Sequence, residues 1–460
     1  MIEIPRAAAR HYWSALRQLL TGVPRRTWPC IQLLADHQGL RIAAHTDKVG
    51  LEFRLPGARS TATLIVSSEL LHTAAEGRGE SVAVEAGSDG VVIARWRDGE
   101  VPRQASFERP RPAAVVARPH LPTNWVEQPS TFCAALRTVM EVTDPESLRY
   151  ALSCVQLDGD AGTFTATDGR QILSHGGWNL GFAGAVLVPA NKVFGNRELT
   201  SADAVRIGKT DSHFVVQAGD WTVWIALNRE GRFPRVNDLL AAGDSAPTRL
   251  MLDLDDRRFL LENLPRLPER SDENGAVTVE LNGRVAIRAQ AADSSPPTEL
   301  VLSRSSRVGD EVRFCTDRRL LSRALELGFH EIAIQNAEQP VVCRDEHRTY
   351  LWALLTPESA IGPATNAITI ESPRNVSAAP VTARSQPPAK SRLASINRIP
   401  PTPDMSTVEP STLGEVEPAN IDALIENAER VKSVLRDAES QVSDLIVALR
   451  RHRVPTPKAL

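Results

Sequence analysis

The 460 residues of this chain carry 53 Lys and Arg against 56 Asp and Glu, which leaves a formal net charge of -3 at pH 7. This length allows about three domains of 100 to 150 residues. The balanced charge excludes a polybasic nucleic-acid tail, so any DNA contact must come from local clusters of arginine. The five cysteines stand singly, without a CxxC pair. They indicate buried free thiols in a reducing compartment rather than a zinc site or disulfide framework.

A short pattern recurs along the chain. An apolar strand closes at Thr46-Asp47, again at Thr167-Asp168 and more weakly at Ala292-Asp293. An amphipathic helix precedes each of these dipeptides, and Val-rich strands follow it. Repetition at intervals of about 120 to 125 residues predicts three similar domains in tandem.

The first copy opens with a helix whose apolar side carries Tyr12, Leu16, Leu19 and Leu20, and whose expected basic face carries Arg6, Arg10 and Arg17. Strands follow over 31–55, a helix over 66–75, a hairpin over 81–96 and a Pro- and Arg-rich connector over 103–127. The N-terminus lacks a cleavage site, and no segment gives 18 uninterrupted apolar residues. We therefore expect a cytoplasmic, soluble protein without a membrane partner.

The second copy opens with a helix over 130–142, and the third with a helix-like segment over 253–264. In both, hairpins and a second helix follow in the order of the first copy. The predicted fold class is α+β, with antiparallel sheets. The predicted domains are 1–115, 127–242 and 246–359.

The composition changes after Ser359. Residues 360–416 are rich in Pro, Ser and Ala and are predicted to be a disordered linker. From Asn420, apolar residues return at 3-4 spacing and predict a coiled-coil helix over 420–453. The alternative is a single amphipathic helix that folds back on the body.

Two segments resemble one family. Residues 147–173 contain an Ala-Thr-Asp-Gly turn followed by a basic and an aliphatic residue, and residues 230–236 read EGRFPRV. Both are similar to the bacterial DNA polymerase III beta subunit, the DNA sliding clamp. Weaker matches at 25–34, 314–325 and 340–357 extend the resemblance over about 1–358.

The resemblance implies a chain that pairs head to tail as a homodimer and closes a ring of six similar domains, with helices on the inside and antiparallel sheets outside. Such a ring encircles duplex DNA without reading its sequence. It tethers DNA polymerase, the clamp loader and repair proteins through short peptide motifs, as a processivity factor in DNA replication. It is not an enzyme and needs no cofactor.

The resemblance implies basic side chains on the inner helices, and DNA contacts from loops at one face, at Arg25 and the pair Arg149-Tyr150. Sequence-independent contact with phosphates requires basic side chains and no groups that hydrogen-bond to base edges. Further arginines lie on the expected helices of the third copy, at 257, 258, 318, 319 and 323. For each of these basic residues, the alternative to DNA contact is that it only solvates an exposed helix face. The expected DNA-binding residues are Arg10, Arg17, Arg25, Arg137, Arg149, Tyr150, Lys192 and Arg197.

The same family has an apolar pocket between its middle and last domains that binds partner peptides. The residues that match its wall are Leu152, Thr167, Gly169, Arg170 and Ile172, although ordinary core packing would also explain the two aliphatic ones. This chain departs from the family where Trp352 to Pro357 replace a Met-Pro-Met-Arg type ending, and where Val236 replaces an aromatic residue. Residues 360–460, which lie beyond the resemblance, begin beside this pocket. We therefore expect the linker or the coiled coil to compete with, or replace, the usual partners.

Catalytic motifs are absent from the sequence. Gly208-Lys209-Thr210 is not part of a phosphate loop, because the first glycine would have to stand at Asp203. The alternative to a clamp is a scaffold with the clamp fold that does not hold DNA and acts through its coiled coil and peptide pocket.

Overall fold

The computed structural model describes residues 1–88, 90–111, 115–147, 150–241, 245–269 and 275–373. The predicted coiled coil over 420–453 lies outside these residues, as does most of the predicted linker. Within the described part, no helix is both long and apolar enough to cross a membrane.

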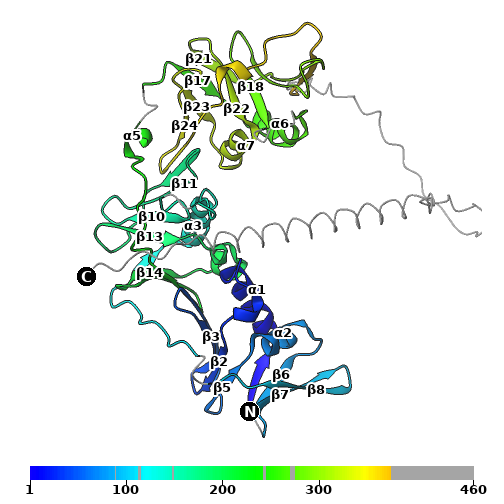
Figure 1. Cartoon of the computed structure of the whole chain (residues 1–460), viewed down its shortest axis with the longest axis vertical. Coiled ribbons are helices and arrows are strands. Elements are labelled where there is room, and N and C mark those ends of the chain that lie inside the picture. Colours follow the sequence, from blue (N-terminus) through cyan, green and yellow to red (C-terminus); the bar gives the residue numbers. More distant parts are fainter. Residues whose placement is uncertain (89, 112–114, 148–149, 242–244, 270–274, 374–460) are drawn as a thin grey trace, which may run out of the picture. The chain divides into compact units, whose positions relative to one another are not determined.

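The described chain repeats one order of elements three times: a strand, a helix, four strands, a helical segment and three strands (Figure 1). We call each repetition a module. Module 1 contains β1 (Ile2–Pro5), α1 (Arg6–Leu19), β2 (Ile31–Asp36), β3 (Gly39–His45), β4 (Val49–Pro56), β5 (Ala62–Val66), α2 (Ser68–Glu76), β6 (Ser81–Ala86), β7 (Val91–Asp98) and β8 (Val101–Glu108).

Module 2 follows the same order, with two short helical segments in the place of α2. Its elements are β9 (Val126–Gln128), α3 (Phe132–Met140), β10 (Cys154–Asp158), β11 (Thr163–Thr167), β12 (Gln171–His175), β13 (Ala185–Pro189), η3 (Lys192–Gly195), α4 (Arg197–Thr200), β14 (Val205–Lys209), β15 (His213–Ala218) and β16 (Trp221–Ala226).

Module 3 follows α5 (Asn237–Leu240) and inserts one extra edge strand, β21, that pairs with β17. Its elements are β17 (Thr248–Met251), α6 (Leu254–Asn263), η4 (Leu264–Arg266), β18 (Ala276–Glu280), β19 (Val285–Ala289), β20 (Thr298–Leu302), β21 (Ser306–Gly309), β22 (Arg313–Asp317), α7 (Arg318–Glu326), β23 (Glu331–Ile334), β24 (Val341–Arg344) and β25 (Arg348–Trp352). The short helix η5 (Pro357–Ser359) and the strand β26 (Ile368–Glu371) come after it.

The modules are joined by continuous sheets. The last strand of module 2, β16, pairs antiparallel with the third sheet strand of module 1, β4, over five residue pairs from Trp221↔Phe53 to Ile225↔Val49. The last strand of module 3, β25, pairs in the same way with β12 of module 2, where Ile172 lies opposite Leu351. The first join merges two four-stranded sheets and the second merges a four-stranded with a five-stranded sheet, so the backbone ladder carries the connection between modules.

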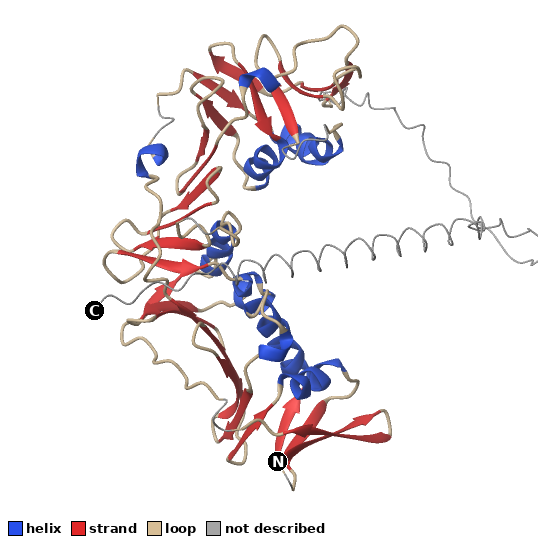
Figure 2. Cartoon of the chain, in the orientation of Figure 1, coloured by secondary structure: helices blue, strands red, loops and turns tan. Residues whose placement is uncertain are grey.

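The first helices of modules 1 and 2 bury the same positions. Tyr12 and Leu16 on α1 correspond to Phe132 and Leu136 on α3, and all four are 0 % exposed. The aromatic and aliphatic side chains at i and i+4 face the sheets, as amphipathic spacing requires. Helices and strands separate into layers on this basis (Figure 2), and the helical layer is continuous between modules because Asn191 Nδ2 donates to Leu19 O at 3.0 Å.

The dipeptide pattern that recurs three times in the sequence lies at equivalent places in the three modules. Thr46 follows β3, Thr167 ends β11, and residues 290–297 connect β19 to β20, always between the second and third strands of a sheet. At Thr167 the hydroxyl accepts from Gly169 N at 3.0 Å and donates to Gln171 O at 2.6 Å. These local bonds explain why a Thr-Asp pair closes the strand.

Two expectations about loops are wrong. Residues 103–108 belong to β8 instead of the expected connector, because Val92, Ala94 and the other strand residues of β7 give them a ladder to pair with. Residues 368–371 form β26 instead of part of a disordered linker, because β20 offers them an open sheet edge. In both cases a pairing partner far away in sequence overrides the local composition.

Candidate functional site

A row of basic side chains lies on the exposed face of the helical layer. Arg17 on α1 and Arg137 on α3 stand at the same helix position, 120 residues apart, and both are exposed while their neighbours at the preceding position are buried. Arg10 lies two turns before Arg17 on α1 and is also exposed. The helix spacing therefore places cations on the side of α1 and α3 that faces away from the core.

The arginines on this face differ in their pairing. Arg137 Nε donates to Glu141 at 2.8 Å, and the same carboxylate accepts from Arg323 at 2.8 Å. Arg10 and Arg17 make no ion pair with any of the described residues. Arg25 stacks over Trp13, with its guanidinium carbon 5.9 Å from the ring centroid. Module 1 therefore presents cations that are available to an anionic partner, whereas the charge of Arg137 is partly compensated.

Lys192 and Arg197 lie on the helical segments of module 2, and both are exposed. Asn191 and Asn196 start these segments by accepting from Val193 N at 2.9 Å and Glu198 N at 3.0 Å, as N-cap residues do. Because η3 lies against α1 and α3, these cations lie next to those of the first helices.

Several expected members of the basic face are structural instead. Arg6 is 0 % exposed and donates to Ala74 O at 2.8 Å, so it joins α1 to α2 rather than facing solvent. Arg318 is 6 % exposed and donates to three backbone carbonyls around residues 267–275. A guanidinium can be buried where carbonyl oxygens satisfy its donors, and the sequence alone does not indicate those carbonyls.

The third module does not repeat the arginine of the first two. The burial of Asp256 and Leu260 on α6 matches that of Tyr12 and Leu16, which puts Leu261 where α1 has Arg17. Arg258 is exposed but paired with Asp255 at 3.2 Å. An exposed arginine at this helix position therefore occurs in modules 1 and 2 and not in module 3.

The five predicted pocket residues line one cavity of about 550 Å³. Leu152, Thr167, Gly169, Arg170 and Ile172 all contribute to its wall. The cavity lies on the sheet join between modules 2 and 3, because Ile172 on β12 pairs with Leu351 on β25. A smaller cavity of about 330 Å³ continues from it and shares Leu239, Pro340 and Leu351.

An apolar cluster forms the floor between the two cavities. Its members come from β12, from the segment before α5 and from β23 to β25: Ile172, Phe233, Val236, Ala333, Val342 and Leu351. Leu239, at the rim, is 45 % exposed. A surface that leaves leucine exposed over a buried aliphatic floor suits an apolar side chain from a partner.

The polar frame of the pocket is fixed by local hydrogen bonds. Asp168 accepts from Arg170 N at 2.8 Å and Gln171 N at 2.9 Å, and Tyr350 donates to Gln171 at 2.8 Å. Arg170 also approaches Asp317 at 3.8 Å. The frame thus holds a guanidinium at the mouth of an apolar cavity.

Tyr150 lies at the pocket rather than with the basic helices. It lines the cavity beside Leu152, is 61 % exposed and has φ +53°, the only positive φ of a non-glycine residue among those described. Arg149, its predicted companion, is outside the described residues. The cavity wall also includes Leu239 and Pro340, which the sequence did not assign to the pocket, and Val236, which it noted only as a departure from the family.

Solved structures of sliding clamps share this fold. The DNA polymerase sliding clamp of Pseudomonas aeruginosa aligns over 77% of this chain and 99% of its own, with a TM-score of 0.64 and 15% identity. The sliding clamp of Bacillus subtilis gives a TM-score of 0.64 at 15% identity over 77% and 98% of the two chains. A putative DNA polymerase III beta subunit from Eubacterium rectale gives 0.63 at 13% over 77% and 99%.

No family model and no curated protein matches the sequence. The likeness to solved structures, at such low identities, establishes the fold: the described chain has the architecture of a bacterial sliding clamp.

Proposed function

We propose that this protein is a clamp-like ring that encircles duplex DNA and tethers replication or repair proteins, without catalysing a reaction itself. Two copies paired head to tail would supply six modules, with the helical layer toward the DNA. We place the protein in the cytoplasm, where it would meet the chromosome. The observation that carries the proposal is the equivalence of Arg17 and Arg137, which stand exposed at one helix position of a clamp fold.

Charge at these positions supports phosphate contact without base recognition. A guanidinium on a helix face reaches a phosphate but offers no fixed pattern to base edges. The neighbouring cations Arg10, Arg25, Lys192 and Arg197 extend the same face across two modules. Binding would be strengthened by topology, because a closed ring cannot leave a duplex sideways.

The pocket would take short peptide segments of a polymerase, a clamp loader or a repair protein. Its apolar floor fits aliphatic or aromatic side chains, and Arg170 at the mouth fits a carboxylate or a backbone carbonyl of the same peptide. Tyr150 and Leu239 are exposed at the rim, so a bound peptide would bury apolar area there that now faces solvent.

Retention on circular and linearised DNA tests the proposal. A ring should stay on a closed circle and slide off after the circle is cut, whereas a surface binder should not distinguish the two. The double variant Arg17→Glu, Arg137→Glu should lose retention on circles. The matched control is Lys48→Glu, Arg109→Glu, which makes the same change of charge at exposed positions outside the helices. Equal retention of both double variants would contradict the proposal.

A second function is favoured by specific observations. The clamp fold could serve as a docking scaffold that holds no DNA, because the third module lacks the equivalent arginine and Arg137 is ion-paired. A scaffold of this kind would act through its pocket and its C-terminal segment. It would bind neither circular nor linear DNA but would still bind peptide.

A further inference from the structure

Each module has two sheets, and one edge of each sheet is of a kind that can join another module. One kind is the third sheet strand, which is β4, β12 or β20, and the other is the last strand, which is β8, β16 or β25. Within the chain, β16 joins β4 and β25 joins β12, both antiparallel. Of these two kinds of edge, β20 and β8 are the ones that join no other module within the described residues. They are one of each kind, so the repeat itself indicates that β8 of one copy suits β20 of another.

The edge of β20 is already occupied. The strand β26 pairs parallel with β20 over four residue pairs, from Thr298↔Ile368 to Val301↔Glu371. Ile368 N donates to Pro297 O at 2.8 Å and Ser372 N donates to Val301 O at 2.9 Å. β20 has five residues, so β26 covers nearly the whole length that an incoming strand would need.

The segment between β25 and β26 crosses module 3 before it reaches this edge. Leu355 N donates to Cys315 O at 2.9 Å on β22, and Ile361 N donates to Thr278 Oγ1 at 2.7 Å on β18. The chain therefore passes over one sheet from its first edge to its last. Only residues 353–367 separate β25 from β26, which is a short tether.

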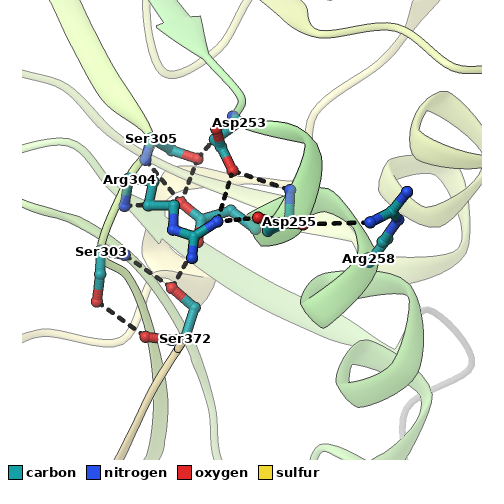
Figure 3. A network of polar contacts seen from close by, with 8 residues as sticks. Asp253, Asp255, Arg258, Ser303, Arg304, Ser305 and Ser372 are labelled. Atoms are coloured by element: carbon teal, nitrogen blue, oxygen red, sulfur yellow. Dashed lines mark hydrogen bonds and ion pairs between the residues drawn. The ribbon is translucent and has the colours of Figure 1, made fainter. Parts of the chain in front are cut away.

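A buried polar network fastens the end of β26 (Figure 3). Ser372 is 2 % exposed and its hydroxyl donates to Asp256, which is 0 % exposed on α6. Ser303 N donates to Ser372 Oγ at 2.8 Å, and Ser303 Oγ donates to Ser372 O at 3.1 Å. Asp256 also accepts from Ser305 N and Arg304 N, at 2.6 Å and 2.9 Å. The anchor thus belongs to the interior of module 3.

We propose that β26 is an intramolecular plug: it covers the edge of β20 that would take β8 of a second copy, and the chain closes head to tail only when β26 is released. The inference rests on the head-to-tail pairing proposed above. A strand on a short tether acts at an effective concentration of the order of mM. A free second copy at micromolar concentration would then compete at a disadvantage of roughly 1000-fold.

Among the described residues, no strand pairs with the outer edge of β8, the complementary edge. Arg109 N donates to Gly90 O at 2.9 Å, so odd-numbered residues of β8 bond to β7 and even-numbered residues point their backbone outward. Pro102 has no N–H to offer there. The outward donors of Gln104, Ser106 and Glu108 remain for an antiparallel partner.

Two proline variants of the full chain separate release of β26 from a general disturbance. Ile368 N and Ser372 N point toward β20, so alternation points Ile370 N there as well and Thr369 N outward. Ile370→Pro should therefore open β26, and Thr369→Pro should leave it in place. Both side chains are exposed. Residues 374–460 are the same in both variants, so any association through that segment is also the same.

The readouts are molecular mass by sedimentation, and hydrogen exchange of backbone amides in β26 and β8, both without DNA. In the unaltered chain and in Thr369→Pro, the amides of Gln104, Ser106 and Glu108 should exchange freely. In Ile370→Pro, amides of β26 should lose protection, and those three amides should gain at least about tenfold protection that disappears on dilution. Adding Ser106→Pro should remove the gain, because this variant deletes an outward donor of β8.

Three results would overturn the plug. One is protection of the β8 amides in the unaltered chain that Ile370→Pro abolishes, which would mean that β8 adds to the outer edge of β26. Another is equal protection of the β8 amides in the unaltered chain and in Ile370→Pro, which would mean that β26 does not block β20. The third is an opened β26 in Ile370→Pro with β8 still unprotected. Pairing of Ile370→Pro without retention on circular DNA would instead support the plug and contradict the DNA-encircling function.

Discussion

At the scale of single residues, the structure buries ionisable groups whose roles depend on partners from distant strands. His45 is 3 % exposed and lies edge-on to Trp224, with ring centroids 5.3 Å apart, beside the join of β4 and β16. Neither ring nitrogen has a hydrogen-bond partner among the described residues. Burial lowers the pKa of His45 to about 4, although Glu52 acts in the opposite direction.

We expect His45 to make the free energy of unfolding depend on pH. Its pKa is near 6.5 in the unfolded chain and about 4 in the folded one. The unfolded state therefore binds the proton first, and stability is lost as the pH falls from about 6.5 toward 4. His45→Leu should remove about 2 kcal/mol of the loss between pH 7 and pH 5, measured by urea unfolding. The exposed His347→Leu is the control, and an unchanged pH dependence in His45→Leu would contradict the assignment.

A buried ion network in module 3 gives a second residue-scale prediction. Arg288 is 2 % exposed and bonds to Glu280 and to Glu299, each at 2.7 Å. Burial would raise the pKa of Glu280, but hydrogen bonds from Arg313 and Arg288 outweigh it and lower that pKa. This carboxylate therefore stabilises the fold above its unfolded pKa, and that stabilisation is lost as the pH falls through the lower folded value.

Arg288→Met should destabilise the protein by about 3 to 5 kcal/mol, because it leaves two buried carboxylates without their shared cation. Arg284→Met is the matched control: Arg284 also bonds to Glu299, but its side chain is 53% exposed. We expect the control to cost about 1 kcal/mol or less. Thermal or urea unfolding measures both, and equal costs would show that the network does not depend on Arg288.

At the scale of elements, the sequence pattern predicted the elements whose formation depends on residues close together in the chain. The 3-4 spacing of Tyr12, Leu16 and Leu19 predicted α1, as observed. β26 could not be predicted in this way, because its partner β20 lies about 70 residues earlier and a four-residue strand has no local signal strong enough to stand alone. The burial of Arg6 escaped prediction for the same reason, since its acceptors are carbonyls of α2.

The β2–β3 hairpin should not tolerate a side chain at its glycine. Gly39 has φ +144°, and an added Cβ would lie 2.2 Å from Leu55 O of the neighbouring strand. Gly57 has φ +122° but open space around the equivalent atom. Gly39→Ala should therefore cost at least about 2 kcal/mol more than Gly57→Ala in urea unfolding. Similar costs would mean that backbone strain alone, and not the contact with β4, limits this position.

At the scale of the whole molecule, the repeat made the candidate sites partly predictable. The five pocket residues meet in one cavity because they flank a strand join that recurs in the fold. The basic face was only partly predictable, since the same residue type serves as a surface cation at Arg17 and as a buried crosslink at Arg318. Spacing indicates which side chains share a helix face. It does not indicate which of them find a partner in another module.

DNA binding by the intact protein should depend steeply on salt, with a slope that reports the number of phosphate contacts. Each contact contributes about -0.9 to the slope of log K against log salt concentration. Replacing Arg10 and Arg17 by Gln should therefore make the slope less negative by up to about 2, measured on circular duplex DNA. Lys48→Gln with Arg109→Gln should leave it unchanged. An unaltered slope in the Arg10, Arg17 variant would place these side chains away from the phosphates.

Asp256 on α6 occupies the position that Tyr12 and Phe132 fill with aromatic rings in the earlier modules. One of its oxygens accepts from the hydroxyl of Ser372. A stop codon after residue 361 would remove the Ser372 hydroxyl from that oxygen, at a penalty of about 1 to 3 kcal/mol, while the other oxygen keeps its bonds from Arg304 N and Ser305 N. The third module therefore depends on residues beyond its own last strand, and a chain that ends at residue 361 should be less stable than one that ends at residue 373.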